Sequence, residues 1–366
     1  MSERLKTFLL ASVVIFLGAG AVSATGFWAF SRLDHGSVDT VEPTATADGP
    51  MATVVVSSNL SSGGDCHDHY TDGCDLFSAQ VDLSSGAVSE VKQLTTGPEG
   101  DIAPVLSADL KNVFYTESSD TDTAMELSLK EGGESRSFST ATNHPSPLAD
   151  GSKAYLVLTN GFFLATVDLQ SAKVSVQKIE GMSSVHEPHV SPTGLVSFYR
   201  LTQGETRGSG SAQAMIYVPS TGKTIEVSEA DGTAHCFWNF DGSQLYCNNR
   251  NKGGILAYSV ATDGTVGDSR VAIAFPSASV LGQVDNEFTS ECLSTSLEYG
   301  SFCDDNHVLL TAGCMIKGEE GLDQKFAETV ILNIETDKFL PVGRNIAESF
   351  GKTGNTWTGT CRVNDE

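Results

Sequence analysis

Basic residues are scarce in this sequence. Its 366 residues include 22 lysines and arginines against 46 aspartates and glutamates, which gives a formal net charge of −24 at pH 7. A folded surface of that charge repels phosphate backbones and anionic lipid headgroups. Nucleic acid is therefore excluded as a direct ligand. Two interpretations of the charge stay open: an ordinary solvated surface, or a surface that stores cations or binds a basic partner.

The sequence also lacks the motifs of several enzyme classes. It contains no Gly-x-Ser-x-Gly nucleophile elbow, no Ser-x-Asp-x-Gly-x-x-Trp box of sialidase-like blades and no Cys-x-x-Cys-His haem site. Beyond residue 50 there is no amphipathic helical pattern of useful length. Short β-rich runs alternate instead with Gly, Asp, Asn and Ser turns, in a chain that is 40% hydrophobic and 19% charged. These features indicate an all-β globular protein.

A long uncharged run is present at the N-terminus. Arg4 and Lys6 precede residues 8–30, which carry no formal charge. A helix of that length spans the roughly 30 Å hydrocarbon core of a bilayer. We therefore expect residues 1–33 to form a signal anchor or transmembrane helix. The alternative is a cleaved signal peptide, because Val22-Ser23-Ala24 has the small residues that signal peptidase requires.

The flanking charges predict the orientation of this segment. The two basic residues before the apolar run keep the N-terminus in the cytoplasm, so everything after Arg32 is exported to the periplasm or the extracellular space. Residues 34–50 have no periodic apolar pattern and are predicted to be a flexible linker. The folded domain is then residues 51–366.

Internal repeats indicate the fold of that domain. Residues 103–116, 144–159, 187–200 and 235–249 each consist of a β-rich run, a tight turn and a second run. Their turn residues Asp109, Asp150, Thr193 and Asp241 are spaced by 41, 43 and 48 residues. This is the period of a four-stranded propeller blade. A fifth copy, residues 299–313, follows after a longer gap and is completed by "ETVILNIE" and "FLPVGR".

The two ends of the domain complement each other. Residues 51–96 provide three strands without an innermost one, and residues 354–363 form a strand with nothing after it. We expect the C-terminal strand to become the innermost strand of the first blade, which closes the ring and leaves no open edge. The sequence thus predicts a six-bladed β-propeller of four-stranded antiparallel blades.

The turns carry a family resemblance. The matching residues are Ser107-Ala108-Asp109, Ala149-Asp150-Gly151-Ser152-Lys153 with Tyr155, Ser191-Pro192-Thr193-Gly194 with Phe198, and Phe240-Asp241-Gly242-Ser243 with Tyr246. They resemble the Ser-Pro-Asp-Gly-Lys-like turn and following aromatic strand of the TolB-type propeller repeat, over most of residues 51–366. The resemblance implies the fold. Propellers of this type serve as envelope scaffolds, as gating domains of peptidases and as lyases, so it leaves the function open.

Equivalent positions in successive blades should form a ring around the central channel. The position six residues before each turn is occupied by Ala103, His144, Glu187, His235 and, in the fifth copy, Tyr299. His144, Glu187 and His235 are a sensible ligand set for a divalent metal such as Ca, Zn or Mn. They resemble the arrangement of TolB-like lyases that act on uronate sugars with a metal held in the channel. The alternative is a hydrated channel mouth lined by polar side chains.

Residues 63–75, "GGDCHDHYTDGCD", connect the second and third strands of the first blade. His67 and His69 offer metal ligands, but the spacing matches neither a zinc finger nor an EF-hand. A Cys66–Cys74 bridge would instead close a short loop in an oxidising compartment. We expect a disulfide-pinned recognition loop, with a metal site as the alternative. The predicted contact residues are Asp65, His67, Asp68, His69, Tyr70 and Asp72.

The other cysteines are expected to pair as well, because eight is an even number and exported thiols oxidise. If Asp241-Gly242 is a two-residue turn, Cys236 and Cys247 lie opposite each other and can form a bridge. A three-residue turn with a glycine bulge would turn them to opposite faces. The remaining predicted pairs are Cys292–Cys314 and Cys303–Cys361.

These features favour a membrane-tethered, exported propeller that acts as a protein-interaction or scaffold subunit of an envelope or membrane complex. Other envelope or membrane proteins are the expected partners, on the loop-rich face bearing residues 61–75, 117–124 and 203–212. A metal-dependent polysaccharide lyase or hydrolase using His144, Glu187 and His235 is the rival hypothesis. A structural protein without partner specificity is a third. No cofactor is expected apart from that metal.

Overall fold

The computed structural model describes residues 49–364 apart from 62–65, 67–72, 131–132, 172–173, 202–211, 230, 318–321 and 353, and leaves out the side chains of 322–326. The predicted anchor, all but the last two residues of the linker, and the recognition-loop residues Asp65, His67, Asp68, His69, Tyr70 and Asp72 lie outside the described residues. Among the described residues, no helix combines the length and the apolar character needed to cross a membrane.

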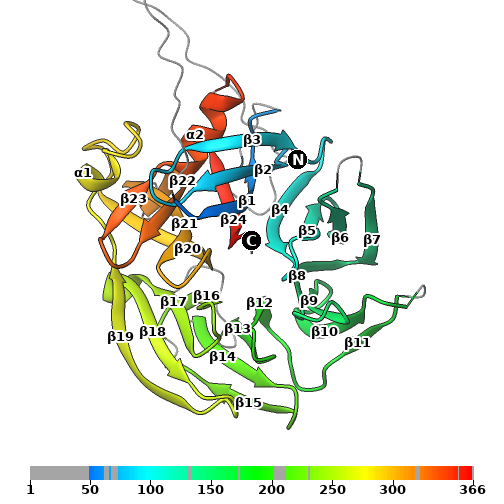
Figure 1. Cartoon of the computed structure of the whole chain (residues 1–366). Helices are drawn as coiled ribbons and strands as arrows, with labels where there is room; N and C mark the ends of the chain where they lie inside the picture. Colours follow the sequence, from blue (N-terminus) through cyan, green and yellow to red (C-terminus); the bar gives the residue numbers. More distant parts are fainter. Residues whose placement is uncertain are drawn as a thin grey trace, which may run out of the picture. The chain divides into compact units, whose positions relative to one another are not determined.

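The described residues form six four-stranded sheets, the blades of a β-propeller, with antiparallel neighbours throughout (Figure 1). From the innermost strand outward they are β24 (Thr356–Val363), β1 (Met51–Ser58), β2 (Asp75–Asp82) and β3 (Val88–Gln93) in blade 1; β4 (Gly100–Leu106), β5 (Asn112–Ser118), β6 (Thr123–Ser128) and β7 (Ser135–Thr140) in blade 2; β8 (Thr142–Pro147), β9 (Lys153–Leu158), β10 (Phe163–Asp168) and β11 (Val176–Lys178) in blade 3; β12 (Val185–Val190), β13 (Val196–Leu201), β14 (Ala212–Val218) and β15 (Lys223–Glu226) in blade 4; β16 (Thr233–Trp238), β17 (Gln244–Asn249), β18 (Gly254–Val260) and β19 (Val266–Ala274) in blade 5; and β20 (Ser294–Phe302), β21 (His307–Lys317), β22 (Leu322–Asn333) and β23 (Lys338–Leu340) in blade 6.

The two ends of the domain meet in blade 1, as predicted. β24 pairs antiparallel with β1, with Val54 opposite Cys361 and Ala52 opposite Val363. In Figure 1 the blue first strand and the red last strand lie side by side. The C-terminal strand is therefore the innermost strand of the first blade, and it closes the ring.

Hydrophobic side chains fill the spaces between blades. Six clusters of buried side chains lie at the six junctions between neighbouring blades of the described chain. At the junction of blades 3 and 4, for example, Leu164 and Val196 are fully buried against each other's blades. Fully burying one such side chain contributes roughly 1.5–3 kcal/mol. The alternating pattern of the strands thus packs sheet against sheet around the channel.

Three local features differ from the sequence-based expectation. The segment "FLPVGR" was expected to be a strand, but β23 ends at Leu340 and an eight-residue helix, α2 (Val342–Ser349), begins at Val342. A second short helix, α1 (Ala278–Leu281), lies in the long gap before blade 6. In blade 5 the turn contains four residues, 240–243, rather than two, because Asn239 N–H donates to the Gln244 carbonyl at 3.0 Å. The pairing register is nevertheless the predicted one, with Cys236 opposite Cys247.

The cysteines form the four predicted disulfides. These are Cys66–Cys74, Cys236–Cys247, Cys292–Cys314 and Cys303–Cys361. Cys236–Cys247 links two strands of blade 5. Cys303–Cys361 joins blade 6 to the closing strand β24, so the ring is fastened covalently as well as by hydrogen bonds.

Candidate functional site

The innermost strand of each blade is bulged at the same place. In each, the pairing with the second strand shifts register where the innermost strand carries one extra residue. In blades 2 to 6 this place is the repeat position identified in the sequence, and its residue has a left-handed backbone. The φ values are 52° for Ala103, 51° for His144, 49° for Glu187, 46° for His235 and 50° for Tyr299. A bulge bends its strand and re-aims the side chain, so these positions form a ring at the channel.

Proline marks three of the six bulges. Pro104, Pro145 and Pro188 each follow the bulge residue in blades 2, 3 and 4. Proline has no N–H to donate to a neighbouring strand and is tolerated within sheets at bulges. The dipeptides Ala-Pro, His-Pro and Glu-Pro are therefore a sequence signal for the bulges. The repeat alignment identified the position of these residues but did not predict that the strand is bulged there.

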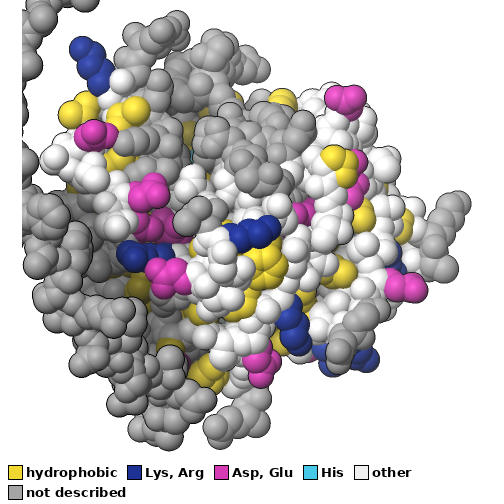
Figure 2. Space-filling model, turned by 90° about the horizontal axis from the view of Figure 1, so that it is seen from above, with side chains coloured by type: hydrophobic (Ala, Val, Ile, Leu, Met, Phe, Trp, Pro, Cys, Tyr) yellow, Lys and Arg dark blue, Asp and Glu magenta, His cyan; other side chains and the backbone are white. Residues whose placement is uncertain are grey.

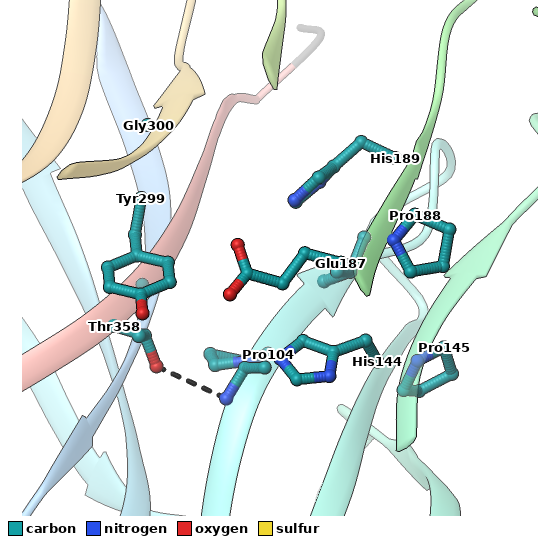
Figure 3. Close-up of a pocket in the computed structure, with 12 residues that line it drawn as sticks. Pro104, His144, Pro145, Glu187, Pro188, His189, Tyr299, Gly300 and Thr358 are labelled. Atoms are coloured by element: carbon teal, nitrogen blue, oxygen red, sulfur yellow. Dashed lines mark hydrogen bonds between the residues drawn. The ribbon is translucent and has the colours of Figure 1, made fainter. Parts of the chain in front are cut away.

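The bulge residues line a narrow cavity in the channel. It measures about 40 Å³, and its walls include His144, Glu187, His189, Tyr299 and Thr358. In Figure 3 the Glu187 carboxylate points across the cavity toward Tyr299, between the rings of His189 and His144. A cavity of this volume has room for only a few water molecules. At this level the channel is a constriction.

Glu187 is held by its neighbours. Its side chain is 2% exposed, and one carboxylate oxygen lies 2.6 Å from Nδ1 of His235 in the next blade. The other oxygen accepts a hydrogen bond from the Tyr199 hydroxyl at 3.5 Å. Burial lowers the pKa of His235, but the Glu187 carboxylate, its hydrogen bond and Glu298 outweigh burial and raise that pKa above its ordinary value. Glu187 and His235 therefore form an ion pair between blades 4 and 5.

The ion pair continues into blade 6. Nε2 of His235 lies 3.8 Å from the Glu298 carboxylate, which is also bonded to the Arg250 guanidinium. Burial raises the pKa of Glu298, but His235 and Arg250 together hold it below its ordinary value. Glu187, His235, Glu298 and Arg250 thus make a row of alternating charge across three blades. Neither Glu298 nor Arg250 could be predicted from the sequence, because no motif links a strand residue to a loop 48 residues earlier.

Aromatic rings follow the same path around the channel. Successive ring centroids from blade 3 to blade 1 lie 4.4 to 5.6 Å apart, in the order Phe162, His186, Tyr199, His235, Tyr299 and Trp357. His186 stacks on Tyr199 at an interplanar angle of 13°. Phe162, at the blade 3 end, is 40% exposed. This arc of rings packs blades 3 to 6 and the closing strand together at one end of the channel.

The predicted metal ligands are only partly brought together. His144 and Glu187 line the same cavity, and His235 contacts Glu187. Within the described part of the chain, however, no group of three or more His, Cys, Asp and Glu side chains has the arrangement of a metal site. Oε2 of Glu187 and Nδ1 of His235 contact each other. A metal ion bound by these two side chains would need the same two atoms as ligands. A divalent metal at His144, Glu187 and His235 stays a prediction.

The base of the recognition loop belongs to the channel mouth. Cys66 and Cys74 are fully buried and pack against Ile102, Ala327 and Trp357. Gly73 N–H donates to the Glu99 carbonyl of the next blade at 3.3 Å. The loop was expected to project from blade 1, but its disulfide is part of the core. The predicted contact residues between the cysteines, with the metal alternative at His67 and His69, lie outside the described residues.

Charged side chains on the visible surface are dispersed. In the view of Figure 2, acidic and basic side chains are separated by uncharged side chains and backbone, and hydrophobic side chains lie in small separate groups. On this face the described atoms do not form one continuous acidic patch. The organised charges are those of the channel row.

Comparisons with known proteins bear on the fold. No protein-family model matches the sequence, and no curated protein sequence does. Among solved structures, the chain is similar to TolB from Acinetobacter baumannii, with a TM-score of 0.56 and 14% identity over 85% of this chain and 66% of that one. It is similar to a putative TolB from Agrobacterium tumefaciens, with a TM-score of 0.51 and 9% identity over 87% and 99%. A chain of the nidogen/laminin complex gives a TM-score of 0.54 and 9% identity over 85% and 98%.

The chain therefore spans 66% of the length of the Acinetobacter protein and nearly all of the other two. At such low identities the likeness bears on the fold alone. Together with the six closed blades and the repeated turns, it establishes the architecture: the chain is a six-bladed β-propeller whose fold is similar to that of the TolB structures.

Proposed function

We propose that this chain is an exported, membrane-tethered propeller that binds other proteins as a subunit of an envelope or membrane complex. The observation that carries the proposal is the state of the channel. Its constriction measures about 40 Å³, and the carboxylates of Glu187 and Glu298 are already engaged by His235 and Arg250. Drug-sized ligands occupy far larger clefts. This arrangement suits a rigid platform for surface loops better than a substrate cavity.

The platform has one loop-rich end. Because neighbouring strands are antiparallel, each blade passes from its second to its third strand at the end where its innermost strand begins. Residues 59–74, 119–122 and 202–211 are such connections, and the helices α1 and α2 join strands at the same end. Binding residues on propellers and similar scaffolds concentrate in such loops. We place the partner surface at this end, around the mouth of the channel.

The disulfides and the structural neighbours both support a location outside the cytoplasm. Four disulfides are typical of an oxidising compartment outside the cytoplasm. Two structural neighbours are TolB proteins, and a third is part of a complex between proteins. The proposal that the protein is tethered to a membrane rests on the sequence of residues 1–33.

If these residues form a membrane anchor, the full chain should sediment with membranes and be released by detergent, whereas salt alone should leave it bound.

Site-specific photocrosslinking in the native cells tests the partner surface. A photoreactive residue is placed at Thr121, an exposed position between β5 and β6 at the loop-rich end. Its matched control is Thr221, an exposed threonine in the turn between β14 and β15 at the other end. The proposal expects a discrete crosslinked adduct from Thr121 and none from Thr221. Adducts from neither position, or equal ones from both, would contradict it.

A second variant tests the recognition loop. Asp68, His69, Tyr70 and Asp72 are replaced by serine while Cys66 and Cys74 are kept, so that the buried disulfide stays intact. If this loop contacts the partner, the Thr121 adduct should fall several-fold. An unchanged adduct would move the contact to the other loops of the same end.

A metal-dependent polysaccharide lyase or hydrolase is the second candidate. The observation in its favour is that His144 and Glu187 line one cavity and His235 contacts Glu187. Elemental analysis of protein purified without chelator decides between the two. Stoichiometric metal that is lost in a His144→Ala, His235→Ala double variant would support the enzyme, and metal-free wild-type protein would remove it.

A further inference from the structure

Two buried aspartates meet at the junction of blades 1 and 2, near the channel mouth but outside the charged row. Asp75 begins β2 and Asp101 lies in β4, and their side chains belong to residues that are 2% and 6% exposed. The Asp101 N–H donates to the carbonyl of Cys74 at 2.7 Å. The backbone next to Asp75 is therefore hydrogen-bonded to the backbone of Asp101. The Cys66–Cys74 disulfide is immediately adjacent.

A continuous hydrogen-bond network joins their carboxylates. Gln93 Nε2 donates to Oδ2 of Asp75 at 3.1 Å and to the Thr95 carbonyl at 3.0 Å. The Thr95 side chain in turn hydrogen-bonds the Asp101 carboxylate, and its hydroxyl accepts from the Leu76 N–H at 2.8 Å. Ser61 also donates to Oδ2 of Asp75. The Gly97 backbone N–H is a further donor to the Asp75 carboxylate. The two side-chain donors, Ser61 and Gln93, use the same carboxylate oxygen, Oδ2.

The other oxygens of the pair are without partners. Oδ1 of Asp75 and Oδ1 of Asp101 are both buried and accept no hydrogen bond from any described residue. No described lysine or arginine forms an ion pair with either aspartate. Burial is the main reason that the pKa of Asp101 is raised to about 7, and the charges of Glu117, Asp75 and Glu99 add to it. Two buried carboxylates with no neutralising charge are costly.

We propose that a calcium ion binds between Asp75 and Asp101 through their partnerless Oδ1 atoms. Calcium fits because every group in the network offers oxygen or amide chemistry, without an imidazole or free thiolate that would favour zinc. It also accepts irregular coordination completed by carbonyls and water, whereas magnesium demands a near-ideal octahedron. Two carboxylates fall short of the three ligating side chains of a conventional site. The affinity therefore belongs to the roughly 0.1–1 mM class of extracellular calcium modules.

Such an ion would tie blade 1 to blade 2. Asp75 belongs to the third strand of blade 1 and Asp101 to the innermost strand of blade 2. Binding to the folded state alone stabilises it by mass action. Because extracytoplasmic calcium reaches millimolar levels only in some compartments, the junction would respond to where the protein is located. This role is independent of the proposed partner surface.

The experiment uses the purified full chain stripped with chelator. Terbium, a luminescent calcium substitute, should bind with emission sensitised by Tyr115 or Trp357, and calcium should displace it. Tyr115 lies close enough for the charge of Asp101 to raise its pKa, and Trp357 packs on Cys74. Addition of about 10 mM calcium should raise the melting temperature by about 2 to 4 °C, and the same concentration of magnesium should have less than half that effect.

Four variants locate the ion. Asp75→Asn and Asp101→Asn keep the shape of the side chain, and each should abolish the calcium-dependent shift and reduce terbium emission at least tenfold. Asp68→Asn with Asp72→Asn, and Asp120→Asn with Asp122→Asn, neutralise the other acidic loops at this end and should leave both signals unchanged.

Three results would overturn the proposal. They are a wild-type melting temperature that does not respond to calcium, a shift that persists in both Asp75→Asn and Asp101→Asn, and a shift that is lost in the acidic-loop controls instead. If the asparagine variants do not fold, equilibrium dialysis of the wild-type chain decides. Fewer than 0.5 calcium ions bound per chain at about 5 mM would then count against the site.

Discussion

Five side chains with a left-handed backbone determine what faces the channel. Ala103, His144, Glu187, His235 and Tyr299 occupy equivalent bulges and have φ values of 46° to 52°. A side chain other than glycine is disfavoured in this region by about 1–2 kcal/mol. The innermost strands maintain it because neighbouring blades pack on both sides. The ring of channel residues is thus set by backbone geometry, and the identity of each residue then sets the chemistry.

Ala103 allows this strain to be measured without disturbing the charged row. Ala103→Gly relieves the left-handed φ of 52° and should increase the free energy of unfolding by up to about 1 kcal/mol. The control is Ala154→Gly, at a fully buried position in the regular strand β9, which should lower it by at least about 1 kcal/mol. Urea denaturation measures both. Equal destabilisation by the two changes would show that the bulge is unstrained.

Glu187 is predicted to control the ionisation of His235. Burial lowers the pKa of His235, and the net rise depends chiefly on Glu187, 2.6 Å away. In Glu187→Gln the burial effect dominates, so the pKa of His235 should fall below its ordinary value of about 6.5. NMR titration of the imidazole measures it. Tyr199→Phe, which removes only the 3.5 Å hydrogen bond to Glu187, is the control and should change the pKa little. If the pKa of His235 is unchanged in Glu187→Gln, the two side chains do not form an ion pair.

At the scale of elements, helix α2 covers the junction between the last blade and the closing strand. Val342, Gly343, Ile346 and Ala347 form its buried face. Beneath it, Glu328 of β22 is 3% exposed and accepts hydrogen bonds from Thr356 of β24 at 2.6 Å and from the Thr329 N–H at 3.0 Å. A side chain at Gly343 would collide with the Glu328 carboxylate. Glycine at this position therefore allows the helix to lie directly on the acid.

Glu328 should make the stability of the protein depend on pH. Burial raises the pKa of Glu328 to about 8 from an ordinary 4.5, with Asp285 and Glu287 adding to the effect of burial. Between those two values the folded state holds the extra proton, so stability is highest below pH 4.5 for this group and falls as pH rises toward 8. Glutamine does not ionise, so Glu328→Gln should not lose this stability as the pH rises. Between pH 5 and pH 8 the free energy of unfolding of wild type should therefore fall by up to about 3 kcal/mol more than that of the variant.

Denaturation of wild type and variant at both pH values measures the effect. Glu335→Gln, at an exposed position of the same blade, serves as the control and should follow the wild-type curve. Parallel curves for wild type and Glu328→Gln would mean that the carboxyl ionises normally.

At the scale of the whole molecule, the ring depends on one strand. β24 pairs with β1, and its Val363 N–H also donates to the Cys303 carbonyl of blade 6 at 2.9 Å. The Cys303–Cys361 disulfide spans the same contact, with a sequence separation of 58 residues. The closing strand is thus held by both of its neighbours, blade 1 and blade 6.

Removing that bridge should loosen the closure. Cys303→Ser with Cys361→Ser is expected to cost about 2–5 kcal/mol and to speed hydrogen exchange of the β24 amides. The control is Cys292→Ser with Cys314→Ser, a bridge with a sequence separation of 22 that does not involve β24. That variant should leave exchange in β24 as in wild type. Equal protection of β24 in both variants would mean that hydrogen bonds alone hold the ring.

Much of this architecture could be predicted from the sequence because its causes are local. The turn residues Asp109, Asp150, Thr193 and Asp241 recur at the period of a blade, and the three N-terminal strands lack an innermost strand that the single C-terminal strand can provide. The register of the blade 5 hairpin also predicted the Cys236–Cys247 disulfide. The eight-residue helix α2 was missed because two turns are too short for a recognisable helical period.

The sequence by itself determined the six-bladed ring, its closing strand and the register that pairs Cys236 with Cys247, since repeat period and strand alternation are properties of neighbouring residues. Only the tertiary structure decided that Glu187 meets His235, that Glu298 meets Arg250 and that the Cys66–Cys74 bridge is buried. These contacts join residues of different blades or strands. Their distances depend on how the bulged strands converge on the channel, which no short stretch of sequence encodes.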